Sequence, residues 1–194
     1  MGQDKYFIFT RENITEDKVI TEIMISGEKL RELEDKLNII FQDYCKKNGH
    51  KFVLIRSSFS RPTGVHSPGY GAEHYYTYEY KCSICGGIHY KSGKGFGYLL
   101  SKGYKREIPQ DLYDNDNFTI DGKTCRTIKE EIDELKTYID YLKHLKKHVR
   151  DYLYFTYPFL TYEDYKKSIE LELQQSELQT DEDETKKLIK KKSI

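Results

Sequence analysis

The sequence contains no tryptophan, only 4 prolines among 194 residues, and a hydrophobic fraction of 37% against 33% charged residues. This leaves few purely apolar side chains for a core. Tyrosine, with 18 residues, is expected to supply much of the missing apolar area, because its ring can be buried while its hydroxyl reaches water or a partner. The length fits one ordinary domain with a helical appendage.

The chain also lacks a net charge, since 32 basic residues balance 32 acidic residues. Proteins that bind DNA non-specifically usually carry an overall basic excess, so that class is disfavoured. Any contact with nucleic acid would have to use a local basic patch. The scarcity of alanine and proline beside abundant lysine, isoleucine, tyrosine and asparagine favours an AT-rich genome as the source.

No apolar run approaches the roughly 18 residues of a membrane span, and the amino terminus lacks the pattern of a secretion signal. We therefore expect a cytoplasmic protein whose 4 cysteines are reduced thiols. The nucleophile motif G-x-S-x-G is missing, and the glycine-rich stretch 92–97 lacks the residue order of a phosphate-binding loop. These absences favour a binding role over catalysis.

The pattern of apolar residues predicts an α+β fold. It predicts a mostly antiparallel sheet covered by one helix over 27–48 with Ser26 as its N-cap. The apolar run at 51–57 predicts a central strand. A long helix near 125–153, capped by Thr127 with Glu130, precedes a shorter helix over 162–178 that is expected to fold back on it. The other predicted strands cover 5–10, 18–25, 75–82 and 88–100.

Three parts follow from these elements. Residues 1–122 would form the α+β domain, residues 123–178 a helical part packed on it or projecting from it, and residues 179–194 a charged, flexible tail.

The central hairpin contains the closely spaced pair Cys82 and Cys85, followed by two glycines. A tight C-x-x-C-G turn directs two thiolates to one point, which suits zinc, and it resembles half of a zinc-ribbon or rubredoxin-type knuckle. His89 follows at a spacing that allows a third ligand. A structural zinc needs four ligands, and the remaining candidates are His74 and the pair Cys45 and His50. The alternative is a turn with two reduced thiols and no metal.

The same hairpin combines basic and aromatic residues, and no acidic residue occurs between Lys81 and Arg106. Rings that stack on bases beside lysines are typical of single-strand binders. The alternative is that the rings form the sheet core and the lysines keep an edge soluble. The predicted partner-binding residues are Tyr78, Tyr80, Lys81, Tyr90, Lys91, Lys94, Lys102, Lys105 and Arg106.

The function predicted from these features is that of a non-enzymatic regulatory protein that docks on a larger macromolecular machine, with a protein as its partner. A small protein from an AT-rich genome fits a phage-type inhibitor of host transcription or of other nucleic-acid machinery. Two alternatives stay open. One is a single-strand nucleic-acid-binding protein, and the other is a small metal-dependent hydrolase that uses His66, Glu73 and His74.

Overall fold

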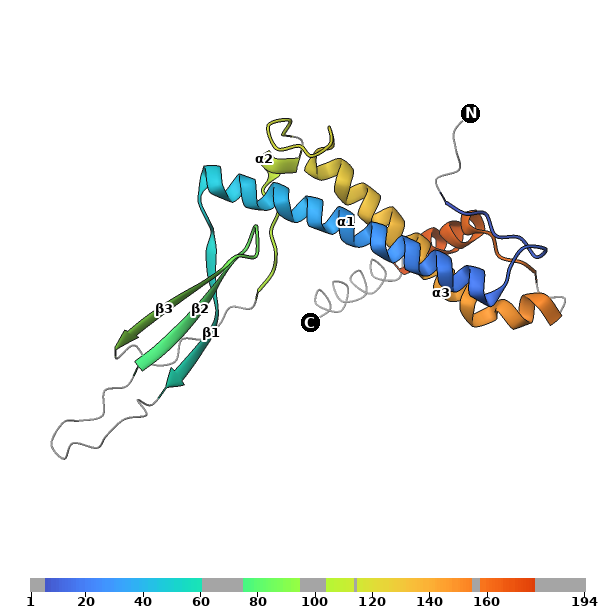
Figure 1. The fold of residues 1–194 in the computed structure, drawn as a ribbon, viewed down its shortest axis with the longest axis horizontal. Helices are drawn as coiled ribbons and strands as arrows, with labels where there is room; N and C mark the ends of the chain where they lie inside the picture. The colour runs from blue at the N-terminus through green and yellow to red at the C-terminus, as the bar shows by residue number, and fades with distance from the viewer. Residues whose placement is uncertain (1–5, 61–74, 95–103, 114, 155–157, 177–194) are drawn as a thin grey trace, which may run out of the picture. The chain divides into compact units, whose positions relative to one another are not determined.

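The computed structural model describes residues 6–60, 75–94, 104–113, 115–154 and 158–176. It has the predicted α+β class (Figure 1). The predicted tail over 179–194 lies outside the described residues. The elements in chain order are α1 (Glu16–Asn48), β1 (Phe52–Ser60), β2 (Tyr75–Cys82), β3 (Ile88–Lys94), α2 (Gln110–Tyr113), α3 (Cys125–Tyr154) and a helix over 162–176.

Helix α1 is longer than predicted, because it includes the stretch 18–25 that the sequence pattern assigned to a strand. The predicted strand over 5–10 is also wrong, since residues 7–10 have no regular secondary structure. The branched residues of 18–25 favour a strand locally. Packing over the whole helix outweighs this local preference. The buried positions of α1 include Val19, Ser26, Leu33 and Ile40, which are spaced seven residues apart. A seven-residue repeat keeps one face of a helix on its partner over many turns.

The predicted N-cap of this helix is wrong for the same reason, because the helix starts at Glu16 and not at residue 27. The helix is capped by Thr15, whose hydroxyl accepts a hydrogen bond of 3.3 Å from the amide of Lys18. Ser26, the predicted cap, lies buried inside the helix.

Helix α3 begins and ends within one residue of its predicted bounds. Its cap is Thr124, whose hydroxyl oxygen accepts a 3.4 Å hydrogen bond from the amide of Thr127, so the predicted capping box at Thr127 is displaced by one turn. Its apolar stripe, the residues that recur at helical spacing from Ile128 onward, is buried up to Val149. After that point Tyr152 is buried in place of Leu153. None of the described helices is long and apolar enough to span a membrane.

The chain divides into two compact units, which are described separately. The helical unit comprises Met1–Arg31 and Ile132–Ile194, and the sheet unit comprises Glu32–Glu131. Both long helices contribute to both units.

Tyrosines build the core of the helical unit, as the composition predicted. Tyr138 is fully buried on α3. Its single hydroxyl proton is shared between the carbonyl of Phe7 at 3.1 Å and the carboxylate of Glu22 at 3.4 Å. Burial, with the nearby charge of Glu22 and the bond to it, raises the pKa of Tyr138. The ring of Tyr6 stacks on that of Tyr138 at 4.3 Å. Each hydroxyl of this kind needs a specific acceptor, so the core is more directional than an aliphatic one.

The helix over 162–176 folds back on α3, as predicted. The hydroxyl of Tyr162 donates to the carbonyl of Glu134 over 3.3 Å, and that of Tyr141 to the carbonyl of Leu160 over 3.2 Å. Thr161 caps this helix by accepting a 3.2 Å hydrogen bond from the amide of Asp164.

The sheet unit contains an antiparallel sheet with the order β1-β2-β3. The prediction that 51–57 forms a central strand is wrong, because within the described residues β1 pairs with β2 alone. Its expected second neighbour would have come from 5–10 or 18–25, which form no strand. The register places Tyr80 opposite Leu54 and His89, so these three residues share one face. A bulge at Leu54/Arg56 interrupts the first pairing.

Burial of the stripe on α3 generates a stability prediction. Leu142 is 0% exposed on α3, whereas Leu171, on the helix over 162–176, is 58% exposed. We expect Leu142→Ala to lower the free energy of unfolding by about 2–5 kcal/mol, because it removes buried methyl groups and leaves a cavity. The matched Leu171→Ala should change it by less than about 0.5 kcal/mol. Urea denaturation followed by circular dichroism measures both, and equal losses would contradict the assigned core.

Candidate metal centre

Four side chains of the sheet unit converge on one point. They are Cys45, His50, Cys82 and Cys85, and their ligand atoms all lie within 4.8 Å of one another. The three cysteines are buried and are free thiols, while His50 is exposed. The residues come from the end of α1, the link to β1 and the turn between β2 and β3, so distant parts of the sequence meet here.

The end of α1 brings the first two residues together. Gly49 has a φ of 86°, a left-handed conformation that glycine adopts without steric cost. Its amide donates a 2.8 Å hydrogen bond to the carbonyl of Cys45, which closes the last turn of the helix. The predicted end of this helix at residue 48 is therefore confirmed. The reversal places Cys45, in the last turn, beside His50, just past the helix.

The turn between β2 and β3 supplies the other two ligands. The amide of Gly86 donates to the carbonyl of Cys82 over 3.0 Å, and the amide of Cys82 donates to the carbonyl of Gly87 over 2.8 Å. Gly86 has a φ of 76°, which explains the need for glycine at this position. The amide of Gly87 lies 3.4 Å from the sulfur of Cys85 and donates to it. This turn, residues 82–87, is called the knuckle below.

Two of the ligand spacings match those around a tetrahedral ion. The sulfurs of Cys45 and Cys82 lie 3.7 Å apart, and the sulfur of Cys85 lies 3.4 Å from Nδ1 of His50. Zinc bound at Zn–S distances of about 2.3 Å and Zn–N distances of about 2.0 Å would set two sulfurs about 3.8 Å apart and a sulfur and a nitrogen about 3.5 Å apart. The four residues could therefore hold a metal such as zinc.

The thiols differ in their electrostatics. Burial opposes the charged form of Cys82, but hydrogen bonds from the backbone amides of Cys85 and Ile84 and from His50 outweigh it and lower the pKa of this thiol. Burial, and then hydrogen bonds to Cys82 and Cys85, raise the pKa of the Cys45 thiol. Because a metal binds thiolates, the lowered pKa of Cys82 favours its role as a ligand, and a metal ion would displace the proton of Cys45.

A segment after β3 supports the knuckle. The guanidinium of Arg106 donates to the carbonyl of Cys85 over 3.1 Å, and the hydroxyl of Tyr104 donates to the carbonyl of Cys82 over 3.1 Å. Arg106 also donates to the side chain of Asn38 on α1 and lies 5.0 Å from the centre of the Phe41 ring. These contacts hold the backbone of the knuckle against α1, and supports of this kind orient metal ligands.

The structure brings together two of the three predicted ligands, Cys82 and Cys85. His89 is not in the cluster, and its ring packs 5.4 Å from that of Phe52. The pair Cys45 and His50, which the sequence offered as one way to complete the shell, lies in the cluster. The other candidate, His74, lies outside the described residues.

The predicted partner-binding residues have different environments. Tyr78 is 4% exposed, and Tyr80 is half-buried, whereas Tyr90, Lys91 and Lys105 are exposed. The ammonium of Lys81 lies 4.4 Å from the centre of the Tyr104 ring, and Arg106 binds the knuckle. Lys102 and the side chain of Lys94 lie outside what the structure describes.

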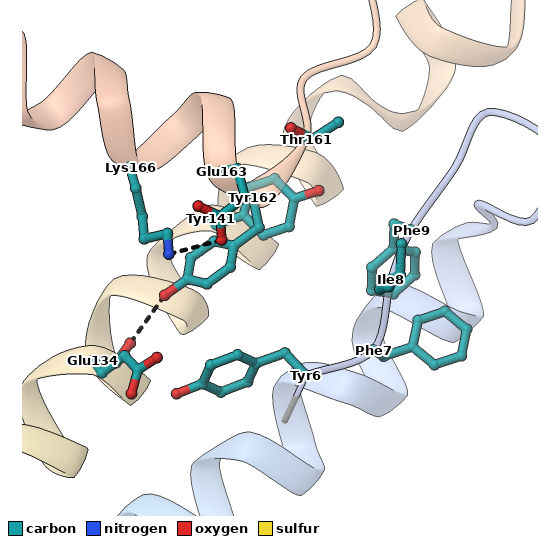
Figure 2. A pocket seen from close by; sticks show the side chains of 10 residues that line it. All are labelled: Tyr6, Phe7, Ile8, Phe9, Glu134, Tyr141, Thr161, Tyr162, Glu163 and Lys166. Carbon is teal, nitrogen blue, oxygen red and sulfur yellow. Dashed lines mark hydrogen bonds and ion pairs between the residues drawn. The ribbon is translucent and has the colours of Figure 1, made fainter. Parts of the chain in front are cut away.

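A hollow of about 400 Å³ lies in the helical unit (Figure 2). Tyr6, Tyr141 and Tyr162 line it together with charged residues. The ammonium of Lys166 pairs with the carboxylate of Glu163 at 2.7 Å and lies 4.8 Å from the centre of the Tyr162 ring. The hollow is lined by aromatic rings, and the ammonium of Lys166 already covers the ring of Tyr162.

Comparison of the chain with protein-family models, with curated proteins and with solved structures finds no match. The function therefore has to be argued from the site itself.

The convergence of the four residues generates a binding prediction. After treatment with a chelator, the full chain should bind one cobalt(II) ion, with the absorption bands of thiolate-to-cobalt charge transfer and of tetrahedral cobalt. Cys82→Ser should weaken this binding at least tenfold, because it removes one of the four ligands.

Cys125→Ser is the matched control, since Cys125 is equally buried but lies outside the cluster. Octahedral cobalt spectra, or equal losses in the two variants, would contradict the site.

Proposed function

We propose that this chain is a zinc-ordered, non-enzymatic regulatory protein that binds a protein partner on a larger macromolecular machine. The observation that carries the proposal is the convergence of four protein ligands, three thiols and one imidazole, within 4.8 Å. Sulfur-rich tetrahedral sets of this kind favour zinc over magnesium, calcium or manganese.

The completeness of the ligand set supports a structural role. Catalytic zinc sites use three protein ligands and keep the fourth position for water or substrate. Here Cys45, His50, Cys82 and Cys85 would fill all four positions. A zinc ion in this shell would have no position at which to activate water. The residues of the hydrolase alternative, His66, Glu73 and His74, lie outside the described residues.

The sheet buries few side chains, so a bound metal would add stability that its core does not provide. Among the described strand side chains, those of Tyr78 and Cys82 alone are buried. A sheet with so little core cannot bury enough apolar area to offset the entropy cost of ordering it. Structural zinc contributes about 10–16 kcal/mol in zinc-finger peptides, so a metal could supply what the core lacks.

The surface of the sheet unit supports a binding role. Large apolar residues are exposed on and beside the sheet. They are Phe52, Ile88, Tyr90 and Tyr104, with Ile39 on α1. The register places Ile88 and Tyr90 on the same face, and a partner protein bound there would cover both. The composition typical of an AT-rich genome extends this to a phage-type inhibitor of host transcription or of another nucleic-acid machine.

Elemental analysis tests the metal part of the proposal. We expect the purified full chain and Cys125→Ser to carry one zinc per chain, and Cys82→Ser to carry much less. Chain that is folded and free of zinc after growth in zinc-supplemented medium would contradict a zinc-ordered protein.

Affinity capture from a lysate of a low-GC bacterium tests the binding part. The wild-type and Cys125→Ser chains should recover the same partner protein in stoichiometric amount, and Cys82→Ser should recover much less of it. Capture that nuclease treatment abolishes would instead favour the single-strand nucleic-acid alternative. Recovery of no stoichiometric protein would contradict the docking role.

A further inference from the structure

Strand β3 ends the described sheet on the side away from β1. Its neighbour on one side is β2, and within the described residues no strand pairs with its other side. A strand at such an edge presents main-chain N–H and C=O groups that an extended peptide can pair with. All the β3 side chains that the structure describes are exposed.

Two large apolar side chains stand on one face of this edge strand. Ile88 is 53% exposed and Tyr90 is 60% exposed. They are two positions apart, and the register places them opposite Lys81 and Glu79 of β2, so both lie on the same face. An added strand would bring alternate side chains over this face and cover the two apolar residues.

The charge around the edge is positive. Lys91 is exposed on β3, Lys105 is exposed after it, and the sequence has no acidic residue between Lys81 and Arg106. Glu79, the acidic residue on β2, is paired with Arg56 of β1 at 3.0 Å. Opposite charges across neighbouring strands stabilise a pair, so an added strand with acidic residues fits better than a basic one.

We propose that the edge of β3 binds an extended acidic peptide segment of the partner protein, which adds a strand to the sheet through main-chain hydrogen bonds. This inference rests on the proposed function, and it names the class of partner. The segment would carry acidic residues near Lys91 and apolar residues at alternate positions, over Ile88 and Tyr90.

Two other occupants fit less well. A second copy of the chain paired through β3 would bring its own lysines to the same short interface, and like charges on facing strands destabilise a pair. A single-stranded nucleic acid needs a series of exposed rings for stacking. Tyr78 is buried, which leaves Tyr90 as the exposed ring among the described residues of β2 and β3 that the sequence proposed for this role.

The metal centre is connected to this edge. Strand β3 starts at Ile88, directly after the knuckle, and the knuckle is closed by the hydrogen bond from Cys82 to Gly87. Loss of the metal would free the start of the strand. Peptide binding is therefore expected to need the intact cluster.

The test uses the zinc-loaded full chain and a displayed library of random 12-residue peptides. Enriched peptides should alternate acidic and apolar residues, and fluorescence anisotropy should measure their binding. Lys91→Glu should weaken binding at least tenfold, while Lys146→Glu, at an exposed lysine of α3, should stay within twofold. Amide hydrogen exchange should slow in β3 when peptide binds.

Selection of no peptide, enrichment of basic or neutral peptides, or slowed exchange elsewhere without change in β3 would overturn the inference. Binding of a dT12 oligonucleotide with no acidic peptide bound would also overturn it, in favour of nucleic acid. Failure of this kind in a zinc-loaded chain that still captures a protein leaves the proposed function standing. Peptide binding that is equal in wild type and Cys82→Ser would instead remove the metal from the proposed function and leave the edge site.

Discussion

The structure of the sheet unit depends on one constraint, the meeting of three thiols and an imidazole from three separate segments. Cys45 belongs to the last turn of α1, and His50 follows that helix. Cys82 is the first residue of the knuckle, and Cys85 lies within it. A metal held by all four would tie the helix, the link to β1 and the hairpin at one point. The sheet itself has a small core, and such a tie would explain how three strands can be stable beside a helix.

The helical unit is stabilised in a different way. Its core contains buried tyrosines whose hydroxyls are paired with carbonyls and a carboxylate, as Tyr138 shows with Phe7 and Glu22. The composition explains this choice, because the chain has no tryptophan and 18 tyrosines. Each buried hydroxyl that has a partner avoids a desolvation cost, and the geometry of these bonds selects one packing arrangement.

Elements were predicted correctly from the sequence where short-range patterns and long-range packing favour the same structure. The knuckle, the helix stop at Gly49, helix α3 and strands β1 to β3 all follow from turn residues or sustained periodicity. The amino-terminal half of α1 was missed because branched residues such as Val19 and Ile23 favour a strand over a short window. The seven-residue spacing that decides for a helix becomes visible only over the whole element.

Two of the four residues of the metal cluster, Cys82 and Cys85, could be predicted from the sequence as a pair of ligands. Two ligands follow from C-x-x-C spacing, but His89 was chosen for its sequence distance, and its ring packs on Phe52 instead. The pair Cys45 and His50 flanks a glycine stop, which is a usable signal, but its meeting with the knuckle is a tertiary contact across 37 residues that no local pattern encodes.

X-ray absorption at the zinc edge of the purified full chain tests the central claim most directly. The account predicts a first shell of three sulfurs at about 2.3 Å and one nitrogen at about 2.0 Å. A shell that contains oxygen ligands, or fewer than three sulfurs, would contradict a metal held by Cys45, His50, Cys82 and Cys85.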